Sequence, residues 1–143
     1  MADNCSDRNE ARAAFLACCG WGEAIVTPLP ADASFRRYFR LQKNGTTRLL
    51  MDAPPPEDVH PFVLVGEHLR KGGLSAPRID HADQAAGFLL LEDFGDATFT
   101  NLLAHGKSER QLLEMAVDTL VHLHEWPGAT DIPLPPYDTE TLL

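Results

Sequence analysis

The stretch GFLLLEDFGD, residues 87–96, decides the fold of this 143-residue chain. Its centre, residues 88–91, is continuously apolar, and such a run is typical of a strand that is buried on both faces of a sheet. A polar turn with a glycine follows at once. Where a buried strand passes into such a turn, backbone groups can bind a flat heterocycle, although an ordinary polar turn explains the same residues.

Four further strands are predicted upstream of this stretch. Residues 23–29 and 35–41 contain the β-branched and aromatic side chains that favour strands. The pair Asn44-Gly45 tolerates the positive φ of a tight hairpin turn, and residues 46–51 continue as a third strand. An antiparallel meander of three strands is therefore expected, with a fourth strand at 77–81.

Helices are expected before, within and after the strands, and the first has Ser6 as its N-cap. The predicted helices span residues 7–19, 57–71, 98–104 and 108–125. The fold class is α+β, in the order helix, three strands, helix, two strands, helices. We expect the sheet to pack its inserted helix on one face and a cleft to form where the last strand passes into the helical layer.

Composition and charge exclude several classes of protein. A hydrophobic content of 44% with 23% charged residues predicts a globular domain, and a net charge of −9 argues against a nucleic-acid binder. No apolar run approaches the roughly 20 residues of a membrane helix, and the N-terminus has no apolar signal region. The three cysteines, Cys5, Cys18 and Cys19, form no C-x-x-C pair, which predicts a reduced, cytoplasmic compartment.

A candidate phosphate-binding loop joins the first two strands. Residues 31–35 are small except for Phe35, so their backbone amides could approach phosphate oxygens, and Arg36 and Arg37 add positive charge. The alternative is an ordinary hairpin loop with two surface arginines, since no G-x-G-x-x-G is present.

Other motifs point to no chemistry. Asp93-Phe94-Gly95 has the letters of the magnesium-binding signature of protein kinases, but the upstream His81-Ala82-Asp83 is not followed by the required asparagine. The histidines form no zinc-binding pattern, and no G-x-S-x-G is present. Asp52 and Glu67 are taken as exposed charges.

Several segments together resemble the aminoglycoside phosphotransferase-like kinases. Within that family they are most similar to the bacterial anomeric sugar kinases, which phosphorylate the 1-hydroxyl of N-acetylmuramate and N-acetylglucosamine in cell-wall recycling. The resemblance extends from about Phe15 to Trp126. The segments that carry it are residues 31–41, 50–55, 61–62, 73–77 and 87–96.

The resemblance implies a two-lobed, protein-kinase-like fold that uses ATP and magnesium. Residues 1–22 would form an N-terminal helix, 23–96 the N-lobe with its five-stranded antiparallel sheet and hinge, and 97–143 the start of a helical C-lobe. Backbone groups near Glu92 and Phe94 would face adenine. The implied nucleotide-binding residues are Ala31, Asp32, Ser34, Phe35, Arg36, Arg37, Met51, Glu92 and Phe94.

Three departures from the family pattern bear on function. Ala31 stands where the related loop commonly begins with glycine, and Met51 falls near the position of the lysine that holds the α- and β-phosphates. Arg36 or Arg37 is hypothesised to replace that lysine. The family's catalytic loop and metal-binding aspartate have no match in these residues, so no catalytic residue is assigned and the magnesium ligands are expected in the C-lobe.

Two functions follow from this pattern. The first is the N-terminal part of a sugar kinase, with ATP and an amino sugar as partners and no kinase activity in this chain alone. The alternative is a non-catalytic nucleotide-binding or interaction module, and an unrelated α+β domain is a third hypothesis. Self-association is expected through an apolar stripe on the last helix, made of Leu112, Met115, Ala116, Leu120 and Leu123. The sugar and the choice between ATP and GTP stay open.

Overall fold

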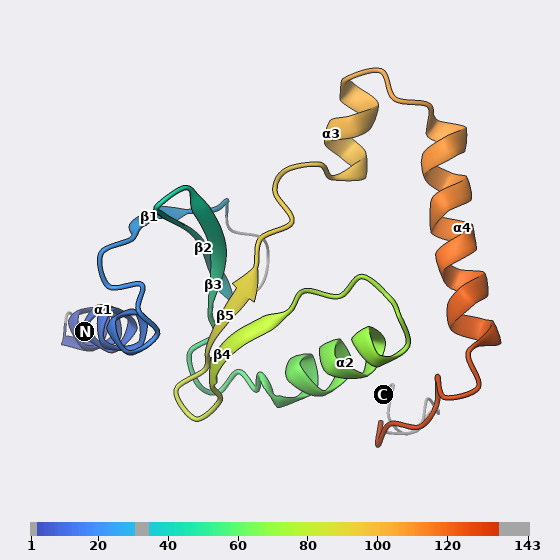
Figure 1. Cartoon of the computed structure of the whole chain (residues 1–143). Coiled ribbons are helices and arrows are strands. Elements are labelled where there is room, and N and C mark those ends of the chain that lie inside the picture. Colours follow the sequence, from blue (N-terminus) through green and yellow to red (C-terminus); the bar gives the residue numbers. More distant parts are fainter. Residues whose placement is uncertain (1–2, 31–34, 135–143) are drawn as a thin grey trace. The chain divides into compact units, whose positions relative to one another are not determined.

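The computed structural model describes the backbone of residues 3–30 and 35–134, and the side chains from residue 7 onward in those ranges. The elements in chain order are α1 (Asp3–Cys18), β1 (Ile25–Pro28), β2 (Arg37–Lys43), β3 (Thr46–Asp52), α2 (His60–Lys71), β4 (Ile79–Asp83), β5 (Phe88–Glu92), α3 (Phe99–Ala104) and α4 (Glu109–Glu125) (Figure 1). This order confirms the predicted α+β class.

The chain divides into two compact units, each described here by itself. The first unit is Met1–Val63 with Pro77–Gly95, and it holds α1 and the sheet. The second is Leu64–Ala76 with Asp96–Leu143, and it holds α3 and α4. The division falls inside α2, whereas the sequence analysis placed all of residues 23–96 in one lobe.

The sheet is antiparallel throughout, in the order β1-β2-β3-β5-β4. Its β2–β3 hairpin closes through Asn44 and Gly45, both at positive φ, which confirms the predicted tight turn. At the β4–β5 end, Gly87 has φ +72°, and a Cβ there would lie 1.9 Å from the carbonyl oxygen of Ala53. Gly87 therefore allows two backbone segments to approach, and its own carbonyl accepts the Ala53 amide at 2.9 Å.

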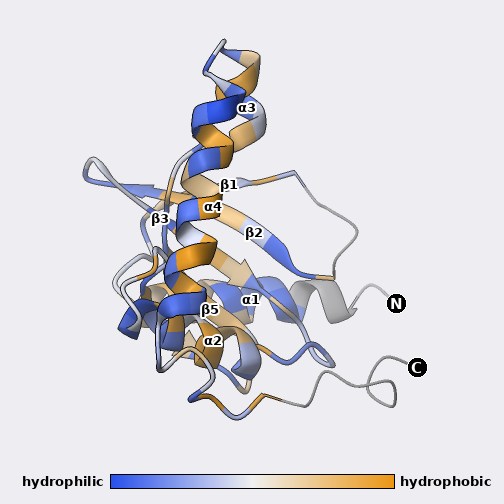
Figure 2. Cartoon of the chain, turned by 90° about the vertical axis from the view of Figure 1, so that its right-hand side faces the viewer, coloured by the Kyte–Doolittle hydropathy of each residue, from blue (hydrophilic) through white to orange (hydrophobic). Residues whose placement is uncertain are grey.

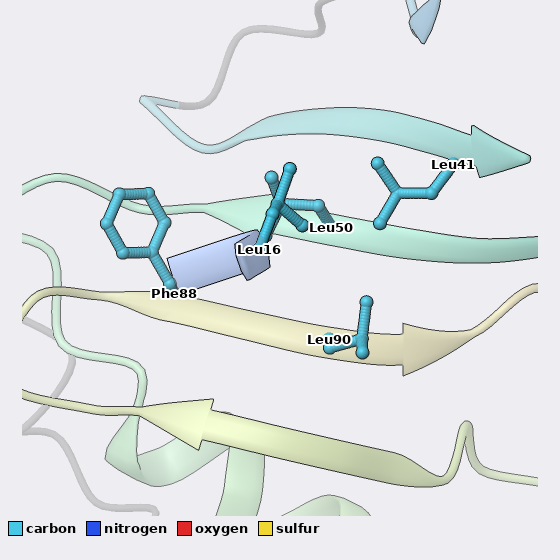
Figure 3. Close-up of a cluster of buried hydrophobic side chains, with 5 residues drawn as sticks. All are labelled: Leu16, Leu41, Leu50, Phe88 and Leu90. Carbon is cyan, nitrogen blue, oxygen red and sulfur yellow. The ribbon is translucent and has the colours of Figure 1, made fainter. Parts of the chain in front are cut away.

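Helix α1 covers one face of the sheet, which we call the α1 face. Its Leu16 packs into a buried cluster with side chains from β2, β3 and β5, and Figure 3 shows these residues gathered on one side of the strands. Phe15 stacks on Phe88 with ring centroids 5.4 Å apart. The members of the cluster are Leu16, Leu41, Leu50, Phe88 and Leu90.

The opposite face, which we call the Met51 face, carries a second buried cluster. The first turn of α2 packs against it through Phe62 and Val63. The cluster consists of Met51, Ala53, Val59, Leu89 and Leu91. Strand β5 thus contributes to both clusters, which confirms that it is buried on both faces. The inserted helix thus packs on one face, as expected, and α1 covers the other.

Two helix starts differ from the sequence analysis. Helix α1 begins at Asp3, so Ser6 lies inside the helix and is not its N-cap. Helix α2 begins at His60 and not at residue 57, because prolines 54–56 precede it and the Asp58 carboxylate accepts the His60 amide at 2.8 Å.

In the second unit, side-chain caps begin both helices. The Thr98 hydroxyl accepts the Asn101 amide at the start of α3, and the Ser108 hydroxyl accepts the Gln111 amide at 3.4 Å at the start of α4. Figure 2 shows hydrophobic residues along α4. Among the described residues, no helix combines the length and apolar character needed to cross a membrane.

Candidate functional site

The strands of the first unit send alternate side chains to the two faces of the sheet, and this alternation separates the two candidate arginines. Tyr38 pairs with Met51 across β2 and β3 and packs on the Met51 cluster. Arg37, one residue earlier, therefore points to the α1 face, where it lies 3.7 Å from Asp52. Arg37 and Met51 are not brought together.

Asp52 lies at the centre of a charge cluster on the α1 face. Its side chain is fully buried, so the prediction of an exposed charge was wrong. Arg8 of α1 donates from Nε to Oδ1 at 2.8 Å and from Nη1 to the carbonyl oxygen of Ala86 at 2.6 Å. Arg12 lies 3.7 Å from Oδ2. A buried carboxylate is stable only with charge partners, and here two of those partners come from α1. The cluster therefore joins α1 to the end of β3 and to the β4–β5 turn.

Aromatic rings hold the same helix arginines in place. The guanidinium of Arg8 lies 3.8 Å from the ring centroid of Phe88, and that of Arg12 lies 4.4 Å from Phe39. Both contacts are of the cation–π type. Sequence reasoning missed this arrangement, since nothing in the spacing of Arg8 and Arg12 shows that both meet Asp52, 44 and 40 positions later.

Arg36 is held on the Met51 side of the sheet. Its Nε donates to Glu57 at 3.1 Å, and both side chains are partly exposed. Val59, two residues after Glu57, belongs to the Met51 cluster, which places this ion pair beside that face. Met51 itself is fully buried among apolar side chains. This face therefore has an arginine just before β2, whereas β3 contributes the apolar Met51 to it.

The predicted hinge follows β5 directly. The Glu92 amide donates to the carbonyl oxygen of Arg78 at 2.8 Å, so it is used within the sheet. The Phe94 side chain is 56% exposed, and within the described ranges its backbone amide donates to no protein acceptor. At this turn the Phe94 amide can therefore donate a hydrogen bond to a ligand, whereas the Glu92 amide already donates to Arg78.

Asp93 organises this turn, and sequence reasoning did not assign it a role. Its Oδ1 accepts the Gly95 amide at 2.9 Å, and its two oxygens accept Nε and Nη2 of Arg40 at 2.8 and 3.3 Å. Only 2% of the Asp93 side chain is exposed. A signal was available, because Asp93 continues the alternation of Leu89 and Leu91 onto the Met51 face.

A third set of charges lies on β4 and β3, away from these residues. Asp80 accepts from Arg78 at 2.6 Å and also from Arg48. The Arg78 hydrogen bond has the largest effect and holds the pKa of Asp80 below its usual value. Burial, the next largest effect, raises this pKa, and the Arg48 hydrogen bond lowers it. Because it lies away from Arg40, this set is a suitable control for the ion pair of Arg40 with Asp93.

The other candidate residues are placed as follows. Phe35 is 81% exposed, and Ala31, Asp32 and Ser34 lie outside the described residues. In the described part of the chain, no three His, Cys, Asp or Glu side chains gather as a metal site would require. The structure brings Arg36 and Glu57 together on one face and Arg37 and Asp52 on the other.

Comparison with known proteins gives a consistent family. Residues 25–142 match the model of a family described as "Phosphotransferase enzyme family". The chain is 43% identical over 127 residues to a Pseudomonas aeruginosa protein named N-acetylmuramate/N-acetylglucosamine kinase, which covers 86% of the chain and 37% of that protein. A Pseudomonas putida protein of the same name is 39% identical over 126 residues, covering 85% of the chain and 36% of that protein.

A more distant relative has the same name. The Caulobacter vibrioides protein is 34% identical over 150 residues, covering 85% of the chain and 41% of its own length. The chain thus spans well under half the length of the curated relatives it matches. With this coverage, the family match and the five-stranded sheet agree: the chain belongs to the phosphotransferase enzyme family.

Proposed function

We propose that this chain is the nucleotide-binding part of an ATP-dependent phosphotransferase that phosphorylates the anomeric hydroxyl of an amino sugar in cell-wall recycling. The names of the relatives support the substrate class. The observation that carries the proposal is the Met51 face of the sheet. Arg36, held by Glu57, lies beside this face, and the turn after β5 has a backbone amide at Phe94 that can donate to a ligand. A cytoplasmic location fits an enzyme that uses ATP.

In this proposal Arg36 is the cation that contacts the phosphates. Protein kinases use a third-strand lysine held by a glutamate, and Arg36, the residue before β2, forms a comparable pair with Glu57. Arg37 is the poorer candidate, because its guanidinium faces Asp52 on the α1 face. The amides of Ala31, Asp32, Ser34 and Phe35 are proposed to cover the phosphates.

The base is proposed to bind at the turn after β5. Backbone groups of Glu92 and Phe94 face adenine, with the Phe94 amide as donor, because the Glu92 amide is engaged by Arg78. Met51 contributes packing beneath the nucleotide and no charge. Magnesium would neutralise phosphate charge when bound, and no ligand for it is assigned among the described residues.

The alternative is a nucleotide-binding or interaction module without catalysis. The buried Met51 favours it, since a phosphate-holding lysine is expected near this position. In either case the chain alone is expected to show no sugar-dependent ATP turnover, because phosphoryl transfer requires a positioned base and metal ligands that these residues do not supply.

Calorimetric titration of the chain with ATP, with and without magnesium, tests the nucleotide site. We expect Arg36→Ala to weaken ATP binding and Arg37→Ala, its neighbour on the other face, to change it much less. Equal effects of the two variants would contradict the assignment of Arg36. Kinase assays on the protein encoded by the uninterrupted reading frame then separate the two functions: phosphorylation of N-acetylmuramate or N-acetylglucosamine supports the enzyme, and ATP binding without turnover supports the module.

A further inference from the structure

On one side, β2 and the residue just before it present two guanidinium groups with a tyrosine between them. Tyr38 and Arg40 lie on the Met51 face, since they pair with Met51 and Leu49 across the hairpin. Arg36, two residues before Tyr38, is held beside the same face by Glu57. At about 3.3 Å per residue, Arg36 and Arg40 lie roughly 13 Å apart along the strand, comparable to the length of an extended nucleoside triphosphate.

The guanidinium of Arg40 is fixed in orientation. Asp93 binds it through both carboxylate oxygens, and the Gly95 amide binds Asp93 in turn, so the group is tied to the turn after β5. Such a fork-to-carboxylate pair is planar and strongly oriented. The Arg40 side chain keeps 18% of its surface exposed, whereas Asp93 keeps 2%.

The charge of this pair also suits a neutral ligand. Asp93 balances Arg40, so the pair adds no net charge beside the turn. Arg36 has a partner as well, but Glu57 and Arg36 are both more exposed, at 25% and 30%, and can exchange partners with a phosphate. Arg36 and Arg40 therefore suit different ligand groups: Arg40 suits a flat, uncharged ring, and Arg36 suits an anion.

We propose that Arg40 is a nucleobase-contacting residue, whose Asp93-oriented guanidinium packs against the face of a purine base. The inference rests on the proposed function and adds a side-chain contact to the backbone contacts of the turn. Guanidinium planes stack on aromatic rings, and the gain is larger where water is partly excluded. Arg40 thus contributes to affinity through the base and not through the phosphates.

Calorimetry with two ligands, ATP and inorganic tripolyphosphate, isolates the base. For Arg40→Ala we expect roughly tenfold weaker binding of ATP and unchanged binding of tripolyphosphate. Arg40→Lys keeps the charge opposite Asp93 but loses the planar group, so it is expected to lose most of the same affinity. The control is Arg48→Ala, which breaks the ion pair with Asp80 on the α1 face of the same sheet and leaves both ligands unaffected.

The outcomes are distinct. If ATP binds equally well to wild type and Arg40→Ala, or if Arg40→Lys binds ATP as wild type does, the base contact is overturned. Equal losses for ATP and tripolyphosphate overturn it too, since the effect would then lie in the phosphates or the fold. If Arg40→Ala does not fold, Arg40→Lys alone decides. A wild-type protein that binds neither ligand overturns the proposed function itself, and a wild type that binds both ligands equally overturns only the base contact.

Discussion

Replacing Asp52 by asparagine should destabilise the first unit severely. The substitution keeps the size of the side chain but removes the negative charge that faces Arg8, Arg12 and Arg37. Asp52 is fully buried, so its hydrogen bond with Arg8 lies where water cannot replace it. Removing one partner of a buried ion pair typically costs about 3–5 kcal/mol.

The structure favours the lower end of that range. Arg8 keeps its hydrogen bond to Ala86 and its contact with the Phe88 ring after the change. Arg12 and Arg37 lie at 3.7 Å and keep 20% and 46% of their side-chain surface exposed, so both can move toward water. We therefore expect Asp52→Asn to lower the free energy of unfolding by about 3 kcal/mol.

The assay is urea unfolding followed by tryptophan fluorescence. Trp21 packs on the α1-face cluster in the first unit, and Trp126 stacks near His68 in the second, so a Trp126→Phe background reports the first unit alone. The matched control is Asp80→Asn, whose carboxylate is partly exposed and should cost no more than about 1 kcal/mol. A free energy of unfolding of Asp52→Asn within about 0.5 kcal/mol of the wild-type value would refute the reasoning. The double variant Asp52→Asn with Arg8→Met should recover part of the lost stability, because both charges of the pair are then removed.

Three further predictions concern acid stability, a backbone contact and an exposed surface. Arg78 lowers the pKa of Asp80 in the folded protein. The ionised Asp80 therefore stabilises the fold above the pKa of the unfolded chain, and this stabilisation is lost as pH falls through the lower folded pKa. Unfolding free energies measured between about pH 2 and 6 should fall less with acid in Asp80→Asn than in wild type. Gly87→Ala should lower the free energy of urea unfolding by at least about 2 kcal/mol, because the new Cβ meets the carbonyl oxygen of Ala53. The control, Gly45→Ala, has open space around the new Cβ and should cost about 1 kcal/mol from its positive φ alone. Equal costs for the two variants would contradict the close approach at Gly87. Polar substitution of the exposed apolar residues of α4 should reduce hydrophobic-dye binding and self-association. An unchanged dye signal would show that the dye binds an apolar surface outside α4. The large exposed apolar residues of α4 are Leu113, Met115, Val117, Leu120 and Val121.

Much of the fold could be predicted because the signals were local. The apolar run of β5, the Asn44-Gly45 turn and the Ser108 cap each act over a few residues, and the structure confirms all three. The predicted apolar stripe on α4 is partly exposed, as self-association through it would require. Leu112 is buried, whereas Met115 and Leu120 are 61% and 55% exposed. Helical spacing predicts which residues share a face but not which of them are covered.

The charge pairs could not be predicted, because each joins residues far apart in the sequence. Asp52 was taken as an exposed charge, since its burial depends on α1 lying across the end of β3. The bond from Arg40 to Asp93 likewise requires β2 and the turn after β5 to be brought together by β3 between them. Local propensity has no information on such pairs, which arise from the strand order.

The two faces of the sheet differ in how tightly their charges are held, and this difference supports the proposal that the nucleotide binds on the Met51 face. On the α1 face, Asp52 is fully buried, and Arg8 lies between it, a backbone carbonyl and an aromatic ring. Opening that face would expose an unbalanced buried charge, so it serves to attach α1. On the Met51 face, the pair of Arg36 and Glu57 is partly exposed and can exchange its partner at little cost. Under the proposed function, a bound phosphate is therefore expected to gain most at Arg36, because the alternation of the strand turns the neighbouring Arg37 to the other face.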